Sequence, residues 1–379
     1  YVRFFDGQKR AAYVVSLGAF LLAAFTKSSV VFFPFTFLLH DLWRGRLNLK
    51  VSAQRLAPYF GISAVAGVMT LRMNAQTFAK EDLWHPPLLE RVLTSFKNIF
   101  MYASKVMLPY PLNFAYRWEN ADPSRIMAWF PIVFIVGVFV ALWRLRRARA
   151  EWAAFLCLAY FVLNLVPAAG CFSTPHMRYS LLADHYVYLS LAGVLVLVVA
   201  ALERVSAQRA GWAWGVAFVF AVLSHNQSQT YLSQETLWSH AAARNPDSVW
   251  AHFNLRATFA RESRYAEARA PLGRAAFGPS DAPEYLIEQI RQSSMNSAAR
   301  AQLETGNPEL AAATLEKLLL RSPNFINATY NLAMIYHQKL GRLDRAEEYY
   351  EKSLKGEHSN AESSESILPA QVNLCNIAV

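Results

Sequence analysis

Residues 177–190 read MRYSLLADHYVYLS and lie at the junction of two long apolar segments, 152–168 and 186–202. The stretch places Arg178, Asp184 and His185 among several tyrosines. Ionisable side chains are costly at the mouth of a membrane span, so they indicate a functional site by default. A tyrosine-belted helix end with snorkelling side chains is the simpler interpretation of the same letters. The sequence on either side decides between the two.

Charge and hydropathy divide the chain in two. Of its 379 residues, 54% are hydrophobic and 17% are charged, below the share of about a quarter that is typical of soluble proteins. The long apolar runs lie before residue 224, and the remainder is rich in Ala, Glu and Arg. We therefore predict a polytopic membrane domain at 1–224 and a soluble domain at 225–379. The net charge of +10 fits basic cytoplasmic loops, and nothing in the soluble half indicates a nucleic-acid partner.

Basic flanking residues predict the topology. Residues 11–43 are too long for a single span and have basic residues on both sides, which favours a hairpin of two short spans that turns at Lys27. Further spans at 57–73, 126–143, 152–168, 186–202 and 211–224 bring the expected total to about seven. The arginines at 144–149 are the strongest cytoplasmic signal. Lys27, the 169–185 loop and the soluble domain then share the outer face.

An amphipathic segment at 88–108 separates two of these spans. Arg91, Lys97 and Lys105 interrupt its apolar residues. We predict an interfacial helix on the outer leaflet, which is typical of such a pattern. A polar transmembrane helix is the alternative, although charges inside a span are rare.

The soluble half carries an internal repeat. The tetratricopeptide pattern is a helix pair of about 34 residues with small residues where the helices cross and a late proline. It occurs at 249–282, 292–325 and 326–360, after a half-repeat at 233–248, and a further copy starts near residue 370. Trp238 and Pro246 have the same spacing as Leu315 and Pro323. The series predicts an α-solenoid, so the whole chain is predicted to be all-α.

Solenoids of stacked helix pairs form an extended concave surface. We expect this surface to bind an extended polypeptide or a partner helix. A helical array that serves only as a rigid spacer is the alternative.

Four pieces of the chain, in this order, resemble one family. They are FTKSSVVFFPFTFLLHDLW at 25–43, VMLPYPLNFAYRW at 106–118, LLADHYVYLSLAG at 181–193 and SQETLWSHAAARNPDSVWAHFNL at 233–255. The family is that of the transmembrane and tetratricopeptide-repeat O-mannosyltransferase-like proteins, in their bacterial form. It belongs to the GT-C superfamily of multi-span glycosyltransferases, which use polyprenyl-phosphate sugars as donors. The resemblance covers nearly the whole chain.

The resemblance implies an enzyme that moves a sugar from a polyprenyl-phosphate donor to protein hydroxyls on the outer face, with the repeats holding the acceptor. Such a reaction needs a carboxylate to take the acceptor's proton and cations to stabilise the leaving phosphate. Arginine offers phosphate a bidentate fork and lysine a point charge. The site residues that we predict are Asp184 and His185 for catalysis, and Lys27, Arg178, His176 and Tyr186 for the lipid phosphate.

The catalytic carboxylate of the superfamily is expected in the first outer loop. That loop would lie upstream of Tyr1, so we expect the chain to be a fragment of a longer protein. Asp184 is the best remaining outer carboxylate, and we expect it to orient Arg178 or His185 rather than to act as the base. Glu119 and Asp122 are interpreted as solvated loop charges. We predict no resident cofactor, with a divalent metal as the alternative, and the three cysteines have no metal-ligand spacing.

A non-enzymatic scaffold is the second hypothesis. Its repeats would recruit envelope proteins to the inner membrane from the periplasmic side. Anchoring a scaffold needs only one span, whereas this chain has about seven, with ionisable groups at one face. That difference favours the enzyme. A transporter would need polar residues at mid-bilayer and inverted repeats, and the sequence has neither clearly.

Overall fold

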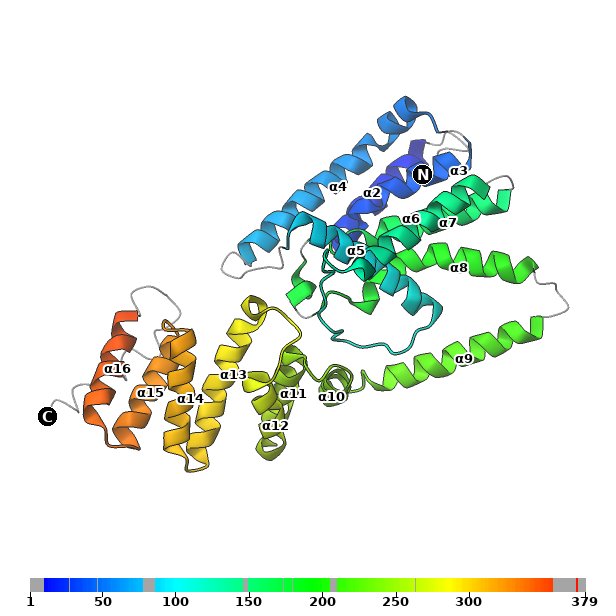
Figure 1. Ribbon diagram of the computed structural model, residues 1–379. Coiled ribbons are helices and arrows are strands. Elements are labelled where there is room, and N and C mark those ends of the chain that lie inside the picture. Colours follow the sequence, from blue (N-terminus) through cyan, green and yellow to red (C-terminus); the bar gives the residue numbers. More distant parts are fainter. Residues whose placement is uncertain are drawn as a thin grey trace. The chain divides into compact units, whose positions relative to one another are not determined.

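The computed structural model describes residues 10–26, 28–45, 47–77, 86–145, 149–172, 174–178, 180–204, 210–262, 264–356 and 373. Every regular element among these residues is a helix, which confirms the predicted all-α class (Figure 1). The chain divides into two compact units, Tyr1–Leu232 and Ser233–Val379. The unit boundary follows a long apolar helix and precedes the first of a series of short helix pairs.

The first unit contains the apolar helices. In chain order they are α2 (Arg10–Thr26), η1 (Ser28–Phe32), α3 (Pro34–Trp43), α4 (Leu49–Thr77), α5 (Leu88–Met107), η2 (Ile126–Trp129), α6 (Phe130–Leu145), α7 (Arg149–Leu165), η3 (Pro175–Arg178), η4 (Asp184–Tyr186), α8 (Val187–Arg204) and α9 (Ala210–Gln229). The segment predicted as a hairpin at 11–43 is broken between α2 and η1. Lys27, the predicted turn, lies outside the described residues.

Three segments in the described part of the chain are long and apolar enough to cross a membrane: Leu49–Met73, Ile126–Leu145 and Asp184–Ala201. The shortest has 18 residues, or about 27 Å of helix, close to the roughly 30 Å hydrocarbon core of a bilayer. Arg10–Thr26, Val30–Trp43 and Trp152–Leu165 are apolar but shorter. The unit is therefore built as a membrane-associated helical domain.

The helices α2 and α3 both pack against α4 (Figure 1). Leu56 and Tyr59 of α4 are fully buried in this cluster, and Phe20 of α2 is buried with them. Tyr59 forms a hydrogen bond of 2.7 Å with Ser16 of α2. Asp41 at the end of α3 is fully buried and accepts a hydrogen bond of 2.9 Å from Ser52 in the first turn of α4. A carboxylate is favourable there because the amino-terminal end of a helix carries partial positive charge. Asp41 thereby joins α3 to α4.

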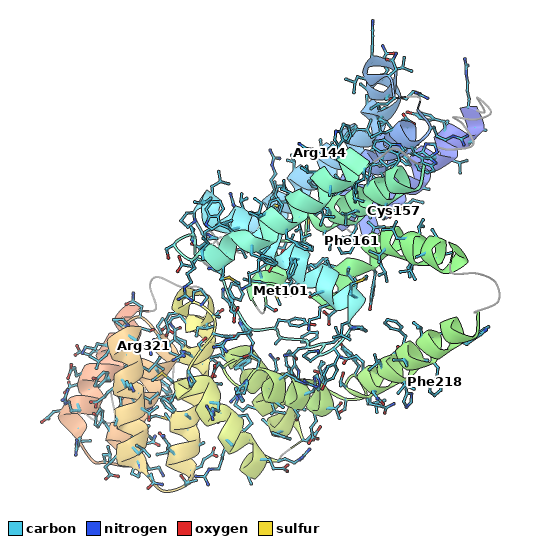
Figure 2. The ribbon with its side chains drawn as sticks, turned by 45° about the vertical axis from the view of Figure 1, so that its right-hand side comes forward. Met101, Arg144, Cys157, Phe161, Phe218 and Arg321 are labelled. Atoms are coloured by element: carbon cyan, nitrogen blue, oxygen red, sulfur yellow. The ribbon has the colours of Figure 1, made fainter. Side chains whose placement is uncertain are left out.

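The helices α7 and α8 approach each other closely at Gly193. A Cβ atom at this position would lie 2.5 Å from the carbonyl oxygen of Cys157 and 3.1 Å from the ring of Tyr160. Small residues allow such approach between apolar helices, where packing rather than exclusion of water stabilises the contact. Figure 2 shows Cys157 and Phe161 along α7, and Phe161 belongs to the buried cluster beneath the 169–183 loop.

The helix α9 exposes apolar side chains on all sides between Trp214 and Val222, and its last turns are polar. Trp214, Val219 and Phe220 are all exposed although they point in different directions around the helix, and Figure 2 shows Phe218 projecting from it. A helix that is hydrophobic all round is suited to a membrane or a large protein core.

The second unit is a series of paired helices. They are α10 (Gln234–Arg244), α11 (Val249–Arg261), α12 (Tyr265–Phe277), α13 (Glu284–Glu304), α14 (Pro308–Arg321), α15 (Ile326–Gln338) and α16 (Leu343–Gly356) (Figure 1). Of the copy predicted to start near residue 370, only Asn373 lies within the described residues.

Local sequence explains where these helices begin and end. Ser233 caps α10 in a reciprocal pair with Thr236, and Ser248 caps α11. Pro308 opens α14, where its missing N–H costs nothing. Gly306 and Gly341 lie in the turns of the second and third helix pairs at φ of 78° and 63°, a conformation that glycine adopts without a Cβ penalty.

Small residues lie at the helix crossings, as the repeat pattern requires. Fully buried alanines recur along the series: Ala241, Ala275, Ala311, Ala328, Ala333 and Ala346. Larger side chains such as Leu315, Leu318 and Tyr350 fill the space between successive pairs. Each pair thus buries its apolar face against its neighbours, which is how a solenoid is stabilised.

Candidate functional site

The candidate site lies on the loop between α7 and α8, and side chains of α5 form hydrogen bonds with the backbone of this loop. The amphipathic helix α5 turns much of its polar face inward. Asn98 is buried and donates hydrogen bonds to the backbone carbonyls of Ala169 at 2.8 Å and Leu181 at 3.4 Å. These bonds satisfy two carbonyls of an irregular loop, which would be costly to bury without partners.

Tyr102, one turn after Asn98, holds the loop two residues further on, at Ala183. Its hydroxyl accepts from the backbone N–H of Ala183 at 3.0 Å and donates to the carbonyl of the same residue at 3.2 Å. Residues four apart on a helix share one face, so α5 binds the loop backbone at 181 and 183 with consecutive turns. The residue that follows in the loop is Asp184.

Asp184 is held by a residue from a different part of the chain. The hydroxyl of Tyr116, in the extended segment after α5, donates a hydrogen bond of 2.8 Å to Oδ1 of Asp184. The second carboxylate oxygen, Oδ2, has no hydrogen-bond partner among the described residues. Asp184 also lies three residues before α8, whose amino-terminal end favours a negative charge. The described partner of Asp184 is thus Tyr116, whereas the sequence suggested Arg178 or His185.

Burial and the carboxylate both act on the supporting tyrosines. The pKa of Tyr116 and that of Tyr102 are raised well above their ordinary values, first by burial and also by the negative charge of Asp184. Both hydroxyls therefore remain protonated at physiological pH. Tyr116 therefore keeps its proton and donates a hydrogen bond to Asp184, so the negative charge of the pair lies on the carboxylate.

Three aromatic rings form a tilted stack that includes His185, the residue after this carboxylate in the chain. The ring of Tyr186 lies 4.6 Å from that of His176 and 4.2 Å from that of His185, measured between centroids. His185 is exposed, while Tyr186 and His176 are partly covered. The stack brings together three of the predicted site residues, which lie up to ten positions apart in the sequence.

His176 is the more buried of the two imidazoles in this stack. Burial, reinforced by His185, lowers the pKa of His176 from 6.5 to about 4, so the ring is neutral at physiological pH. Its Nδ1 shares a hydrogen bond of 2.8 Å with the hydroxyl of Thr174. Its Nε2 is buried and has no hydrogen-bond partner among the described residues. When Thr174 donates to Nδ1, the proton of His176 lies on Nε2 and is free for a ligand.

The two predicted cations are outside the described residues. Lys27 is one of them, and the side chain of Arg178 is the other, although the backbone of Arg178 belongs to η3. Among the described residues, the cation that acts on the Asp184 carboxylate is Lys105 of α5. It lies one turn beyond Tyr102, on the helix face that also carries Asn98. Its amino group lies 5.5 Å above the ring centre of Tyr116 and donates to the carbonyl of Pro111 at 2.5 Å.

The two loop carboxylates interpreted as solvated charges are exposed. Glu119 pairs with Lys97 of α5 at 3.0 Å, and Asp122 accepts from the Ser124 hydroxyl at 2.6 Å. The Glu119 pair ties the segment that carries Tyr116 to α5. Neither carboxylate belongs to the hydrogen-bonded set around Asp184.

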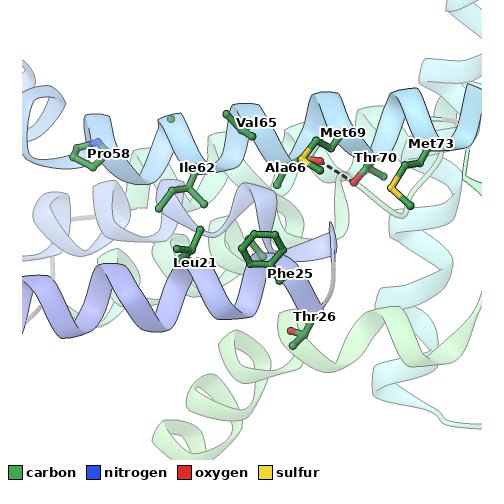
Figure 3. Close-up of a pocket in the computed structure, with 12 residues that line it drawn as sticks. Leu21, Phe25, Thr26, Pro58, Ile62, Val65, Ala66, Met69, Thr70 and Met73 are labelled. Carbon is green, nitrogen blue, oxygen red and sulfur yellow. Dashed lines mark hydrogen bonds between the residues drawn. The ribbon is translucent and has the colours of Figure 1, made fainter.

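An apolar groove of about 590 Å³ runs between α2 and α4 (Figure 3). Its volume lies within the range of roughly 300–1,000 Å³ that is usual for small-molecule sites. Its polar lining is small: the Thr70 hydroxyl, for example, donates to the carbonyl of Ala66 within its own helix. Figure 3 shows side chains from both helices facing the groove, among them Leu21, Phe25, Ile62, Val65 and Met69. Thr26, at the end of α2, also lines it, so Lys27 follows directly in the chain.

The described residues contain no group of three or more His, Cys, Asp or Glu side chains that could hold a metal ion. The candidate site therefore consists of a carboxylate, two imidazoles and three tyrosines. Sequence reasoning missed Asn98, Tyr102 and Tyr116. The signal for Asn98 and Tyr102 was their spacing of four, which places both on one face of a helix; Tyr116 had no such signal.

The first helices of the three helix pairs in the second unit, α11, α13 and α15, lie next to one another along the series. The Nδ2 atom of Asn331 in α15 donates to Oδ1 of Asn296 in α13 at 2.9 Å. Asn254 stands at the position of α11 that Asn331 occupies in α15, six residues into each helix. Side-chain amides can donate and accept at once, which suits them to a polypeptide backbone.

Comparison with known proteins identifies the repeat. The family model described as tetratricopeptide repeat matches residues 326–355, which cover α15 and nearly all of α16. No curated protein matches the chain. The match confirms the predicted repeat at this position and, with the apolar helices of the first unit, indicates a protein that associates with membranes and binds protein partners.

Proposed function

We propose that this membrane-associated, tetratricopeptide-repeat-containing protein is a glycosyltransferase that moves a sugar from a polyprenyl-phosphate donor to a protein hydroxyl on the outer face of the inner membrane. The observation that carries the proposal is the Tyr116–Asp184 hydrogen bond beside the stack of His176, Tyr186 and His185. A held carboxylate and a largely buried imidazole both lie on the loop that leads into α8. Ionisable groups are costly at a membrane surface, so a cluster of them indicates a functional site.

Asp184 is the proposed base. The acceptor oxygen attacks the anomeric carbon of the sugar, and the bond from that carbon to the phosphate oxygen breaks. The electron pair leaves with the polyprenyl phosphate, and the acceptor's proton passes to the carboxylate. Because Oδ1 is occupied by Tyr116, Oδ2 is the atom that takes the proton. This assignment gives Asp184 a more direct role than the orienting one expected from the sequence.

The phosphate would be bound by one neutral group and two cations. His176 is neutral because its pKa is about 4, so it would offer the Nε2 proton as a hydrogen bond and no charge. Arg178 and Lys27 would supply the positive charge that stabilises the leaving phosphate. Tyr186 and His185 complete the edge of this site.

The groove between α2 and α4 would hold the start of the lipid chain. It is apolar and long, and Lys27 follows its last lining residue on α2, Thr26. A lipid phosphate at Lys27 would therefore continue directly into hydrocarbon surroundings. The face of α11, α13 and α15 would hold the acceptor polypeptide.

The test uses purified protein in liposomes with a panel of polyprenyl-phosphate hexoses and envelope proteins as acceptors. Asp184→Asn should lower kcat/KM by about 10²- to 10⁴-fold, the usual contribution of general base catalysis. Asp122→Asn, which changes an exposed carboxylate, should leave it within twofold. Transfer by Asp184→Asn at the wild-type rate would remove Asp184 from the mechanism. No transfer by the wild-type protein with any donor would remove the enzyme itself.

A membrane-anchored scaffold is the second candidate, and the family match within α15 and α16 favours it. Stacked repeats are suited to protein partners whether or not the first unit is catalytic. A photoreactive residue in place of the exposed Arg300 of α13 distinguishes the two. An enzyme should crosslink to the same proteins that it glycosylates, whereas a scaffold should crosslink to partners that carry no added sugar. Leu320, on the second helix of the same pair, is the matched control position.

A further inference from the structure

We propose that Tyr116 is a positioning residue that holds the Asp184 carboxylate in its ionised form, with Oδ2 turned toward the acceptor. The catalytic use of this arrangement rests on the proposed function, but the contact itself does not. Tyr116 and Asp184 are 68 residues apart in the chain, and their side chains meet at 2.8 Å. No other described residue forms a hydrogen bond with the carboxylate.

Two features leave the carboxylate with little freedom apart from rotation of its own side chain. In the residue just before it, Ala183, the backbone N–H and the carbonyl are both hydrogen-bonded to the hydroxyl of Tyr102. The carbonyl of Leu181 is fastened by Asn98. Because α5 fixes the backbone, the side-chain orientation of Asp184 depends on the one bond from Tyr116.

The segment that carries Tyr116 is itself anchored. Lys105 lies above the ring of Tyr116 and binds the carbonyl of Pro111. Lys97 binds both the backbone carbonyl and the carboxylate of Glu119, at 3.1 and 3.0 Å. Two cations of α5, four residues to either side of Met101, therefore hold the segment on both sides of Tyr116.

Charged and titratable groups approach Asp184 from three places besides its own turn. Lys105 and Tyr102 face it from α5, Tyr116 from the segment after α5, and Tyr231 from the end of the first unit after α9. Of these groups only Lys105 is charged at neutral pH. Its contact with Tyr116 is with the ring and not with the hydroxyl, so we expect removal of that hydroxyl to change one interaction of Asp184.

A hydrogen bond donated to a carboxylate favours its ionised form. The variant Tyr116→Phe keeps the ring and the contact with Lys105 but removes the donor. The proton affinity of Asp184 should therefore increase. Since hydrogen bonds to charged groups are among the stronger ones, we expect the titration midpoint of Asp184 to move up by about one pH unit.

The experiment measures the reaction of Asp184 with a hydrophobic carbodiimide, which modifies protonated carboxyl groups, across a range of pH in the full chain in liposomes. Mass spectrometry of the peptide that carries Asp184 gives the midpoint without any need for activity. Tyr116→Phe should shift this midpoint upward, and the acidic limb of kcat/KM should shift with it. Tyr188→Phe, whose ring is 71% exposed, should shift neither.

An unchanged midpoint in Tyr116→Phe overturns the inference. A shifted midpoint in a protein that transfers no sugar supports the inference and overturns the proposed function. A shifted midpoint with an unshifted acidic limb likewise supports the contact and shows that Asp184 is not the base. The two proposals therefore fail separately.

Discussion

The packing of the solenoid predicts the cost of removing one leucine. Leu315 of α14 is 0% exposed and lies in the cluster with Ala311, Leu318 and Ala333. Leu315→Ala removes a fully buried side chain and leaves a cavity, because close-packed neighbours collapse only in part. Substitutions of this kind cost about 2–5 kcal/mol, and we expect about 3 kcal/mol in the free energy of unfolding of the second unit.

The matched control lies on the same helix. Leu320 is 85% exposed, so Leu320→Ala removes an identical side chain without a cavity and should cost less than about 0.5 kcal/mol. Both changes replace leucine by alanine in a helix, so the small difference in helix propensity cancels between them. The comparison therefore measures burial alone.

The assay is urea unfolding of the full chain in detergent micelles, followed by circular dichroism at the helix band. The apolar helices of the first unit keep their hydrogen bonds in the micelle and should not respond to urea. With a slope of about 1.5 kcal/mol per molar urea, 3 kcal/mol corresponds to a midpoint lower by about 2 M. Equal midpoints for the two variants, or a larger effect of Leu320→Ala, would refute this account of how α14 packs.

Two further predictions concern the first unit. Gly193→Ala should lower the stability against unfolding in SDS by about 1–3 kcal/mol, because the new Cβ would lie 2.5 Å from a carbonyl oxygen of α7. Gly137→Ala is the control, since a Cβ there has nothing within 4 Å, and it should not lower the stability. An equal loss in both variants would contradict the close approach of α7 and α8. The pKa of His176 is lowered from 6.5 to about 4, so its contribution to stability should be complete above pH 6.5 and decline toward pH 4, by roughly 3 kcal/mol at most. His176→Gln should remove this part of the pH dependence and the exposed His225→Gln should not, as thermal unfolding at a series of pH values would show.

The repeat unit was readable from the sequence because its information is local and periodic. A tetratricopeptide helix pair needs small residues at fixed positions, and Ala311 and Ala346 stand where the pattern requires them. The turn glycines Gly306 and Gly341 precede the helices that carry these two alanines. The tetratricopeptide match at 326–355 and the all-helical structure confirm this part of the prediction.

The candidate site was readable only in part. Asp184, His185 and Tyr186 are adjacent in the sequence, and an unusual density of ionisable and aromatic residues singled them out. Tyr116 carries no such signal, since a tyrosine in an extended loop is ordinary. Its role depends on a contact across 68 residues, and no local pattern specifies which distant side chain a loop will meet.

The helix α5 shows the same limit. Its amphipathic pattern predicted two faces, and an interfacial helix was the natural interpretation. In the structure, Asn98 and Tyr102 of the polar face are buried against the α7–α8 loop, while Leu88 and Met107 are exposed. Periodicity predicts that a polar face exists. Only the neighbouring segments in the fold decide whether water, lipid headgroups or a loop backbone forms the hydrogen bonds of that face.

The sequence by itself therefore determined that the chain is all-α, that apolar helices come first and that helix pairs follow, because hydrophobic period and small-residue spacing are properties of short segments. The tertiary structure alone decided that the polar face of α5 binds a loop and that Tyr116 holds Asp184. The physical reason is that hydrogen bonds between distant segments are set by how whole helices pack, and a buried polar group must find its partner there, since burial removes the water that would otherwise satisfy it.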